Sequence, residues 1–141
     1  MVKLTPKQRI ILRLKFGGRC AYCGVILPDK GWHADHVEPV WRELRWDREN
    51  GRYVATGNVY RPQNDNKENM FPTCRACNID KSSSSVEDWR GWLQDRMIDS
   101  MRTRIPNFRH AERFGRIVVS EEPLIFWFER YTAEVNRAVQ S

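Results

Sequence analysis

The sequence predicts an α+β domain whose parts are joined by a metal site. A helix-start signal stands near the N-terminus, an Asn50-Gly51 dipeptide separates two segments of strand-like composition, and four cysteines form two C-x-x-C pairs. The 141 residues are enough for one domain with a modest core. We therefore expect residues 1–141 to form a single domain with an N-terminal helix, a small amount of sheet and C-terminal helices.

The stretch "LTPKQRIILRLKFGG" predicts the N-terminal helix. Thr5 and Gln8 have the spacing of a capping box, and Pro6 suits the first helical position. Gly17-Gly18 should end the helix just before the first cysteine pair. The residues expected to form its apolar, core-facing side are Ile10, Ile11 and Leu14.

The middle of the chain predicts strands. "GWHADHVEPV" has alternating character and should be a strand that runs into a turn at Pro39. Residues 41–60 carry the Asn50-Gly51 hairpin signal. The polar run 61–69, "RPQNDNKEN", should form a loop that leads to the second cysteine pair.

Helices should dominate the last third of the chain. A short helix is expected after Cys77, and Ser85 can cap a longer helix that extends to about residue 103. "NFRHAERFG" predicts one more short helix, closed by Gly115. "RIVVS" and "LIFWFERY", separated by "EEP", suggest a β-hairpin, and a helix over 122–138 is the alternative.

Composition narrows the class of protein. A formal net charge of +6 and a pI of about 9.4 favour a polyanionic partner, although basicity alone is weak evidence for one. No apolar run approaches the roughly 20 residues of a membrane span, and "MVKLTPKQRI" lacks the apolar core of a signal peptide. We therefore expect a cytoplasmic protein with no membrane partner, in a compartment where thiols stay reduced.

The cysteines predict a structural zinc site. Cys20, Cys23, Cys74 and Cys77 form two C-x-x-C pairs separated by 50 residues. Each pair can present two sulfurs to one face of an ion, and two pairs complete a tetrahedron. The alternatives are two disulfides or four unrelated buried thiols. A four-thiolate site is coordinatively closed, so it would hold the fold and would not perform chemistry.

Four stretches, "CAYC", "ADHVEP", "ENMFPTCRACN" and "CNIDK", occur in this order. In this combination the sequence resembles the HNH endonucleases, and small phage or prophage members in particular. The resemblance covers about residues 17–82 and implies a ββα-metal core held by the four-cysteine zinc site. Residues 83–141 are then a C-terminal extension packed on that core, and the setting is the cytoplasm of a bacterial host cell.

The resemblance also implies roles for four residues. His36 would be the general base that activates water, and Asn69 would orient the loop and the histidine by hydrogen bonding. Asp35 and Asn78 would hold one catalytic Mg²⁺ or Mn²⁺, since hard oxygen ligands suit these ions. The last motif position is Asn instead of His, which leaves much of the coordination to water and phosphate. The implied substrate is DNA, cleaved to a 5′-phosphate and a 3′-hydroxyl.

Plainer interpretations stay open beside these roles. Asp35 and His36 could form a surface turn, Asn69 could be a turn former, and Asn78 could cap a helix. His33, two residues before Asp35, could face the same metal or be an ordinary strand histidine. For the whole chain, the alternative is a zinc-held nucleic-acid-binding module without catalysis, and nothing in the sequence distinguishes a monomer from a dimer.

DNA contacts would come from basic side chains outside these motifs. Within the expected hairpin, arginines stand beside Trp41 and Trp46, a combination that suits contact with a nucleic-acid backbone. Acidic residues are interleaved with them, so a solvated hairpin is the alternative. The hairpin arginines are Arg42, Arg45, Arg48 and Arg52, and a second candidate surface comprises Arg102, Arg104, Arg109 and Arg113.

Overall fold

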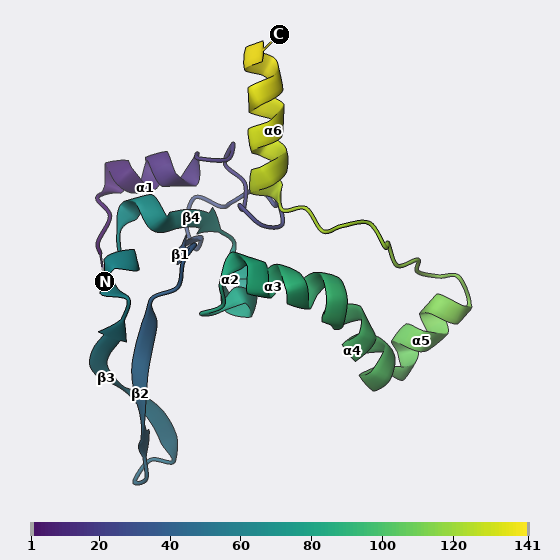
Figure 1. Ribbon diagram of the computed structural model, residues 1–141, viewed down its shortest axis with the longest axis horizontal. Coiled ribbons are helices and arrows are strands. Elements are labelled where there is room, and N and C mark those ends of the chain that lie inside the picture. The colour runs from purple at the N-terminus through teal and green to yellow at the C-terminus, as the bar shows by residue number, and fades with distance from the viewer. Residues whose placement is uncertain (1, 141) are drawn as a thin grey trace. The chain divides into compact units, whose positions relative to one another are not determined.

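A computed structural model describes residues 2–140, and these residues divide into two compact units. Among the described residues, unit 1 comprises 2–85 and 126–140, and unit 2 comprises 86–125. Unit 2 is thus an insertion in the sequence of unit 1, and the predicted C-terminal extension, residues 83–141, is divided between them. The mixed α+β class predicted from the sequence is confirmed (Figure 1).

The elements follow one another along the chain with helices at both ends and the strands in the first half. In unit 1 they are α1 (Pro6–Arg13), β1 (His33–His36), β2 (Trp41–Asp47), β3 (Arg52–Tyr60), the 3₁₀ turns η1 (Pro62–Asn64) and η2 (Lys67–Asn69), β4 (Met70–Thr73), α2 (Arg75–Lys81) and α6 (Trp127–Gln140). In unit 2 they are α3 (Val86–Gly91), the π-helical turn η3 (Trp92–Arg96), α4 (Met97–Arg104) and α5 (Pro106–Arg113).

Two small antiparallel sheets form in unit 1. β1 pairs with β4, with Asp35 opposite Phe71 and His36 opposite Met70. β2 pairs with β3 around the Asn50-Gly51 turn, and an irregularity between Arg42 and Leu44 shifts the register. A strand within residues 31–40 and a hairpin over 41–60 were both predicted from sequence. Both are present, with the first strand limited to His33–His36.

Helix α1 begins as predicted but buries a different face. The Thr5 hydroxyl accepts from the Gln8 N–H, and the Gln8 side chain accepts from the Thr5 N–H, which completes the capping box. The predicted core-facing side is wrong, because Ile10, Ile11 and Leu14 are exposed. Leu12 in the helix and Phe16 in the following turns are the buried residues instead.

An aromatic cluster forms the centre of unit 1. Phe16 meets Phe71 edge to face with ring centroids 5.0 Å apart, and Phe71 lies 4.9 Å from Phe128. Tyr22 packs 5.1 Å from Phe126, which is 2 % exposed. These rings come from the α1 region, from β4 and from the C-terminal segment, so their packing joins distant parts of the sequence.

The predicted C-terminal β-hairpin is wrong, and the alternative of a helix is correct in kind. Within the described residues, 117–125 form no strand, and α6 covers Trp127–Gln140. The backbone N–H groups of Trp127 and Phe128 donate to the carbonyls of Tyr22 and Ala21. The Trp127 indole donates to the Phe16 carbonyl at 2.9 Å. These tertiary bonds hold the start of α6 against the segment that carries Cys20 and Cys23.

Unit 2 is a string of helices with its own contacts. The long helix predicted to reach residue 103 is present, but η3 interrupts it between α3 and α4. Arg102 of α4 makes a two-pronged ion pair with Glu112 of α5, at 2.9 and 2.7 Å. The Arg109 guanidinium donates to the carbonyl of Arg102 at the end of α4. The short helix predicted over residues 107–115 is confirmed as α5.

Within residues 2–140, none of the helices combines the length and the apolar composition that crossing a membrane requires.

Truncation of Phe126 should expose how much unit 1 depends on its aromatic cluster. Phe126→Ala removes a buried ring and should lower the free energy of unfolding by about 3–5 kcal/mol. The matched control is Tyr53→Ala, because Tyr53 is an aromatic residue of the same unit that is 66 % exposed. Urea unfolding followed by circular dichroism measures both. Equal losses for the two variants would contradict the proposed core.

Candidate functional site

The four cysteines of unit 1 come together as the sequence predicts. Their sulfur atoms all lie within 4.8 Å of one another, and none forms a disulfide. Cys20 and Cys23 belong to the turn after α1, where the Gly24 N–H donates to the Cys20 carbonyl. Cys74 is the N-cap of α2, and its sulfur accepts from the Cys77 N–H. The two disulfide pairings considered from the sequence are therefore absent among residues 2–140.

The geometry of this four-cysteine cluster fits a tetrahedral metal ion. Four sulfurs about 2.3 Å from a central zinc would lie about 3.8 Å from one another, and the Sγ atoms of Cys23 and Cys74 are 3.8 Å apart. A hydrogen bond from Cys77 lowers the pKa of Cys20 to about 4, so one sulfur is a thiolate at neutral pH. Burial raises the pKa of Cys23 to about 11. A divalent cation would offset the cost of further thiolates, so the cluster could hold a metal such as zinc.

Asp35 is a buried carboxylate near the end of β1. It is 5 % exposed, and its Oδ2 accepts from the Tyr22 hydroxyl at 2.8 Å and pairs with the Lys81 ammonium at 3.0 Å. Burial raises the pKa of Asp35, while Lys81 and Tyr22 act in the opposite direction. Asp35 is therefore not part of a surface turn, and that alternative is wrong.

The second oxygen of Asp35 has a different environment. Oδ1 has no hydrogen-bond partner among residues 2–140, and no described side-chain oxygen is both fully buried and without a partner. Oδ1 is thus reached by solvent. One carboxylate oxygen is fixed by protein donors, and the other is open to a ligand.

Lys81 is the buried partner of this carboxylate. Its side chain is 1 % exposed, and its ammonium also donates to the His36 carbonyl at 3.0 Å. A lysine from α2 therefore ties the last two residues of β1 to the helix.

His36 forms a second polar pair beside the first. Its Nε2 lies 2.9 Å from Oδ1 of Asp65, in the loop between η1 and η2. Burial tends to raise the pKa of Asp65, but hydrogen bonds from His36 and from the Val2 N–H outweigh it and lower the pKa. Asp65 is thus ionised at neutral pH and can only accept, so Nε2 of His36 is the donor of this bond, and the neutral form of the ring that makes it has its lone pair on Nδ1.

Asn69 holds the loop that follows His36. Its side-chain oxygen accepts from the Glu38 N–H at 2.9 Å, and its amide nitrogen donates to the carbonyls of Glu38 and Asn64, each at 2.8 Å. Its own carbonyl accepts from the Val37 N–H. Asn69 is therefore a bridge between the loop after His36 and the segment that carries Asp65.

Asn78 lies in the interior of α2, so the helix-cap alternative is wrong; Cys74 is the cap. The Asn78 side chain has no hydrogen-bond partner among the described residues. Asp35, His36 and Asn78 line one cavity of about 520 Å³. The structure thus brings three of the predicted site residues to one solvent-accessible space.

A neighbouring cavity adds positive charge around the histidine. It measures about 490 Å³, and its lining includes His36 and Asp65 together with the basic side chains of Lys3, Arg9 and Arg42. Arg42 lines both cavities. An anionic group that reached His36 would therefore meet cations on more than one side.

His33 does not join this arrangement. It is exposed at the start of β1, and neither cavity is lined by it. Sequence reasoning missed Asp65, Tyr22 and Lys81 as partners of the site. Their contacts depend on how loops and α2 pack on β1, and no local sequence pattern predicts these contacts.

Comparison with family models, with curated proteins and with solved structures found no match to this chain.

Loss of one cysteine should remove bound metal. The purified chain should hold about one zinc per molecule, and Cys74→Ser should lower this content and the thermal stability together, because zinc affinity contributes to folding. Elemental analysis of the protein beside a melting curve measures both. His33→Ala, which removes an exposed histidine, is the control and should keep its zinc. Unchanged zinc in Cys74→Ser would contradict the four-sulfur site.

The Asp35–Lys81 pair should behave as an energetic unit. Asp35→Asn leaves a buried ammonium without its carboxylate and should cost about 3–5 kcal/mol of unfolding free energy. Lys81→Met should also destabilise, and the double variant should lose clearly less than the two single losses added together. Urea unfolding of all four proteins gives the coupling. Strict additivity would show that the two groups do not interact.

Proposed function

We propose that the chain is a metal-dependent endonuclease of the HNH type that hydrolyses phosphodiester bonds of DNA. The observation that carries the proposal is the meeting of Asp35, His36 and Asn78 at one cavity, with His36 held by an ionised Asp65. The antiparallel pairing of β1 with β4, followed directly by α2, also supports it, because the expected ββα arrangement has this order.

His36 is the general base in this proposal. In the tautomer that donates from Nε2 to Asp65, Nδ1 can take a proton from water, and the resulting hydroxide attacks phosphorus. The bond from phosphorus to the 3′ oxygen breaks, and the 3′ alkoxide that leaves takes a proton from solvent water. The products are a 5′-phosphate and a 3′-hydroxyl. Asp65 acts through His36, since it fixes the tautomer and stabilises the imidazolium that forms.

Two oxygen ligands suit a hard divalent cation. Oδ1 of Asp35 is open to solvent, and the Asn78 side chain has no partner among the described residues, so both fit Mg²⁺ or Mn²⁺. When bound there, such an ion would offset negative charge on the phosphoryl and leaving oxygens. The nearby ammonium of Lys81 already balances much of the Asp35 charge, so we expect weak affinity in the absence of DNA.

A second candidate function is a nucleic-acid-binding module without catalysis. The observation that favours it is the ammonium of Lys81 beside Asp35. With Lys81 3.0 Å from Asp35, the carboxylate is neutralised without a metal, and the pair could serve the fold alone. In this case the zinc site would still hold unit 1, and the basic cavity around Arg42 would bind phosphate without cleaving it.

A plasmid assay separates the two candidates. Supercoiled DNA incubated with the protein and Mg²⁺ or Mn²⁺ should convert to open circles or linear DNA, and His36→Ala should slow conversion by about 10²–10⁴-fold. Asp65→Asn should lower the rate less than His36→Ala does, because it loses orientation and not the base. His33→Ala is the matched control and should cleave at the wild-type rate. Binding without metal-dependent cleavage by the wild-type chain would favour the second candidate.

A further inference from the structure

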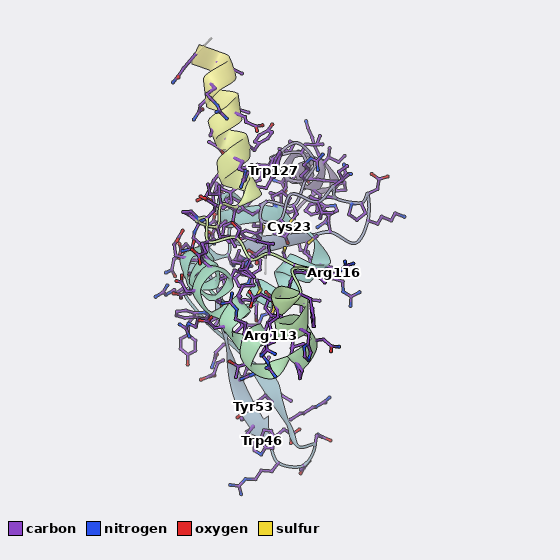
Figure 2. The ribbon with its side chains drawn as sticks, turned by 90° about the vertical axis from the view of Figure 1, so that its right-hand side faces the viewer. Cys23, Trp46, Tyr53, Arg113, Arg116 and Trp127 are labelled. Carbon is purple, nitrogen blue, oxygen red and sulfur yellow. The ribbon has the colours of Figure 1, made fainter. Side chains whose placement is uncertain are left out.

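The β2–β3 hairpin of unit 1 presents an aromatic pair that unit 1 does not use for packing. Trp46 and Tyr53 face each other across the strands, with ring centroids 5.1 Å apart at 66° (Figure 2). Trp46 is 49 % exposed and Tyr53 66 %. Two large rings held edge to face and left in solvent form an apolar surface that a ligand could cover.

This aromatic face continues into the candidate site. Side chains two apart on a strand point to the same side, so Leu44 and Trp46 share a face, and Tyr53 joins them from the paired strand. Leu44 and Arg42 line the cavity that Asp35, His36 and Asn78 also line. The register shifts between Arg42 and Leu44, so Arg42 is connected to this side through the shared cavity and not through strand alternation. Arg42, Leu44, Trp46 and Tyr53, here called the cavity-side face, therefore lead from the aromatic pair to His36.

The charge of the hairpin favours an anionic ligand. Within residues 2–140, none of Arg42, Arg45, Arg48 and Arg52 makes an ion pair or a side-chain hydrogen bond. Two of the three hairpin acids accept from neutral groups instead: Glu43 accepts from Thr56 and Asn58, and Asp47 accepts from Asn50. The third, Glu49, lies beside the Asn50-Gly51 turn. The guanidinium groups thus remain available for phosphate.

We infer that the cavity-side face binds a single DNA strand, whose unpaired bases stack on Trp46 and Tyr53 while its backbone passes Arg42 toward His36. The inference rests on the proposed function, because it assigns the form of DNA that the same site receives. Exposed rings favour unpaired bases, since a duplex hides the faces of its bases and offers only edges and phosphates.

The length of the face sets the size of the bound segment. Four residue-to-residue steps along β2 lead from Arg42 to Trp46, which corresponds to about 13 Å. A stacked strand rises about 3.4 Å per nucleotide, so about four nucleotides fit between the aromatic pair and the cavity. Single strands shorter than this should lose the stacking contribution.

Binding is tested with the zinc-loaded full-length chain carrying His36→Ala, so that no DNA is cleaved. Fluorescence anisotropy gives the Kd for a labelled single-stranded 20-mer and for the duplex of the same sequence. Trp46→Ala, added to this background, should raise the single-strand Kd by about fivefold or more and the duplex Kd by less than about twofold. Trp46→Phe, which keeps a stacking ring, should restore most of the affinity.

The matched control is Phe114→Ala, because Phe114 is an exposed aromatic residue of α5's C-terminal end, 78 % exposed, outside the hairpin. It should leave both Kd values unchanged. Equal losses for single strand and duplex in Trp46→Ala would overturn the inference in favour of groove binding. No loss for either DNA would overturn it as well and assign the face to a different class of partner.

The outcome is separable from that of the proposed function. If the wild-type chain cleaves no DNA but Trp46→Ala weakens single-strand binding, the strand-binding face stands and the nuclease fails. If the wild-type chain cleaves DNA and Trp46→Ala binds single strands normally, the nuclease stands and the face is wrong.

Discussion

Four sulfur atoms join the turn after α1 to the first turn of α2, across 50 residues of intervening sequence. This contact fixes where α2 starts, because Cys74 is its N-cap and Cys77 lies in its first turn. Asn78 and Lys81 follow within one helical turn, at the spacings that share a face. The same short helix therefore contributes two ligands to the sulfur cluster, one amide to the cavity and the ammonium that pairs with Asp35. A shift of the cluster would move all four groups together.

The second constraint is the charge balance beside β1. The carboxylate of Asp35 and the ammonium of Lys81 are both almost fully buried, and each is tolerated because the other is 3.0 Å away. The pair leaves one carboxylate oxygen open to solvent, and it fixes the His36 carbonyl through Lys81. Asp35 therefore has two roles: one carboxylate oxygen stabilises the fold through Lys81 and Tyr22, and the other faces the cavity.

The features that the sequence predicts correctly are those set by residues close together in the chain. The capping box at Thr5, the turn at Asn50-Gly51 and the cysteine spacing each rest on neighbouring residues, and each is present. The core-facing side of α1 was mistaken because the run of isoleucine and leucine offers more than one apolar stripe. The burial of Leu12 depends on tertiary packing that the run itself does not encode. The C-terminal helix was uncertain for a similar reason. Its start depends on carbonyls of Ala21 and Tyr22, more than a hundred residues earlier, and the periodicity of apolar residues cannot predict such a bond.

Asp65 is the clearest case of a contact that the sequence does not predict. It is one aspartate in a polar loop, and no neighbouring residue indicates that it will pair with His36.

The bonds that fix the start of α6 bear on how the chain becomes folded during its synthesis. Because Trp127 and Phe128 donate to Tyr22 and Ala21, unit 1 lacks part of its aromatic cluster until the segment after residue 126 has emerged from the ribosome. By then the 40 residues of unit 2, 86–125, have already emerged and can adopt their helices. The N-terminal part of unit 1 therefore stays incomplete, with Tyr22 and Phe71 partly uncovered, while residues 86–125 emerge. Zinc taken up by the four sulfurs, all of which emerge before residue 86, would hold the early segments together through that interval.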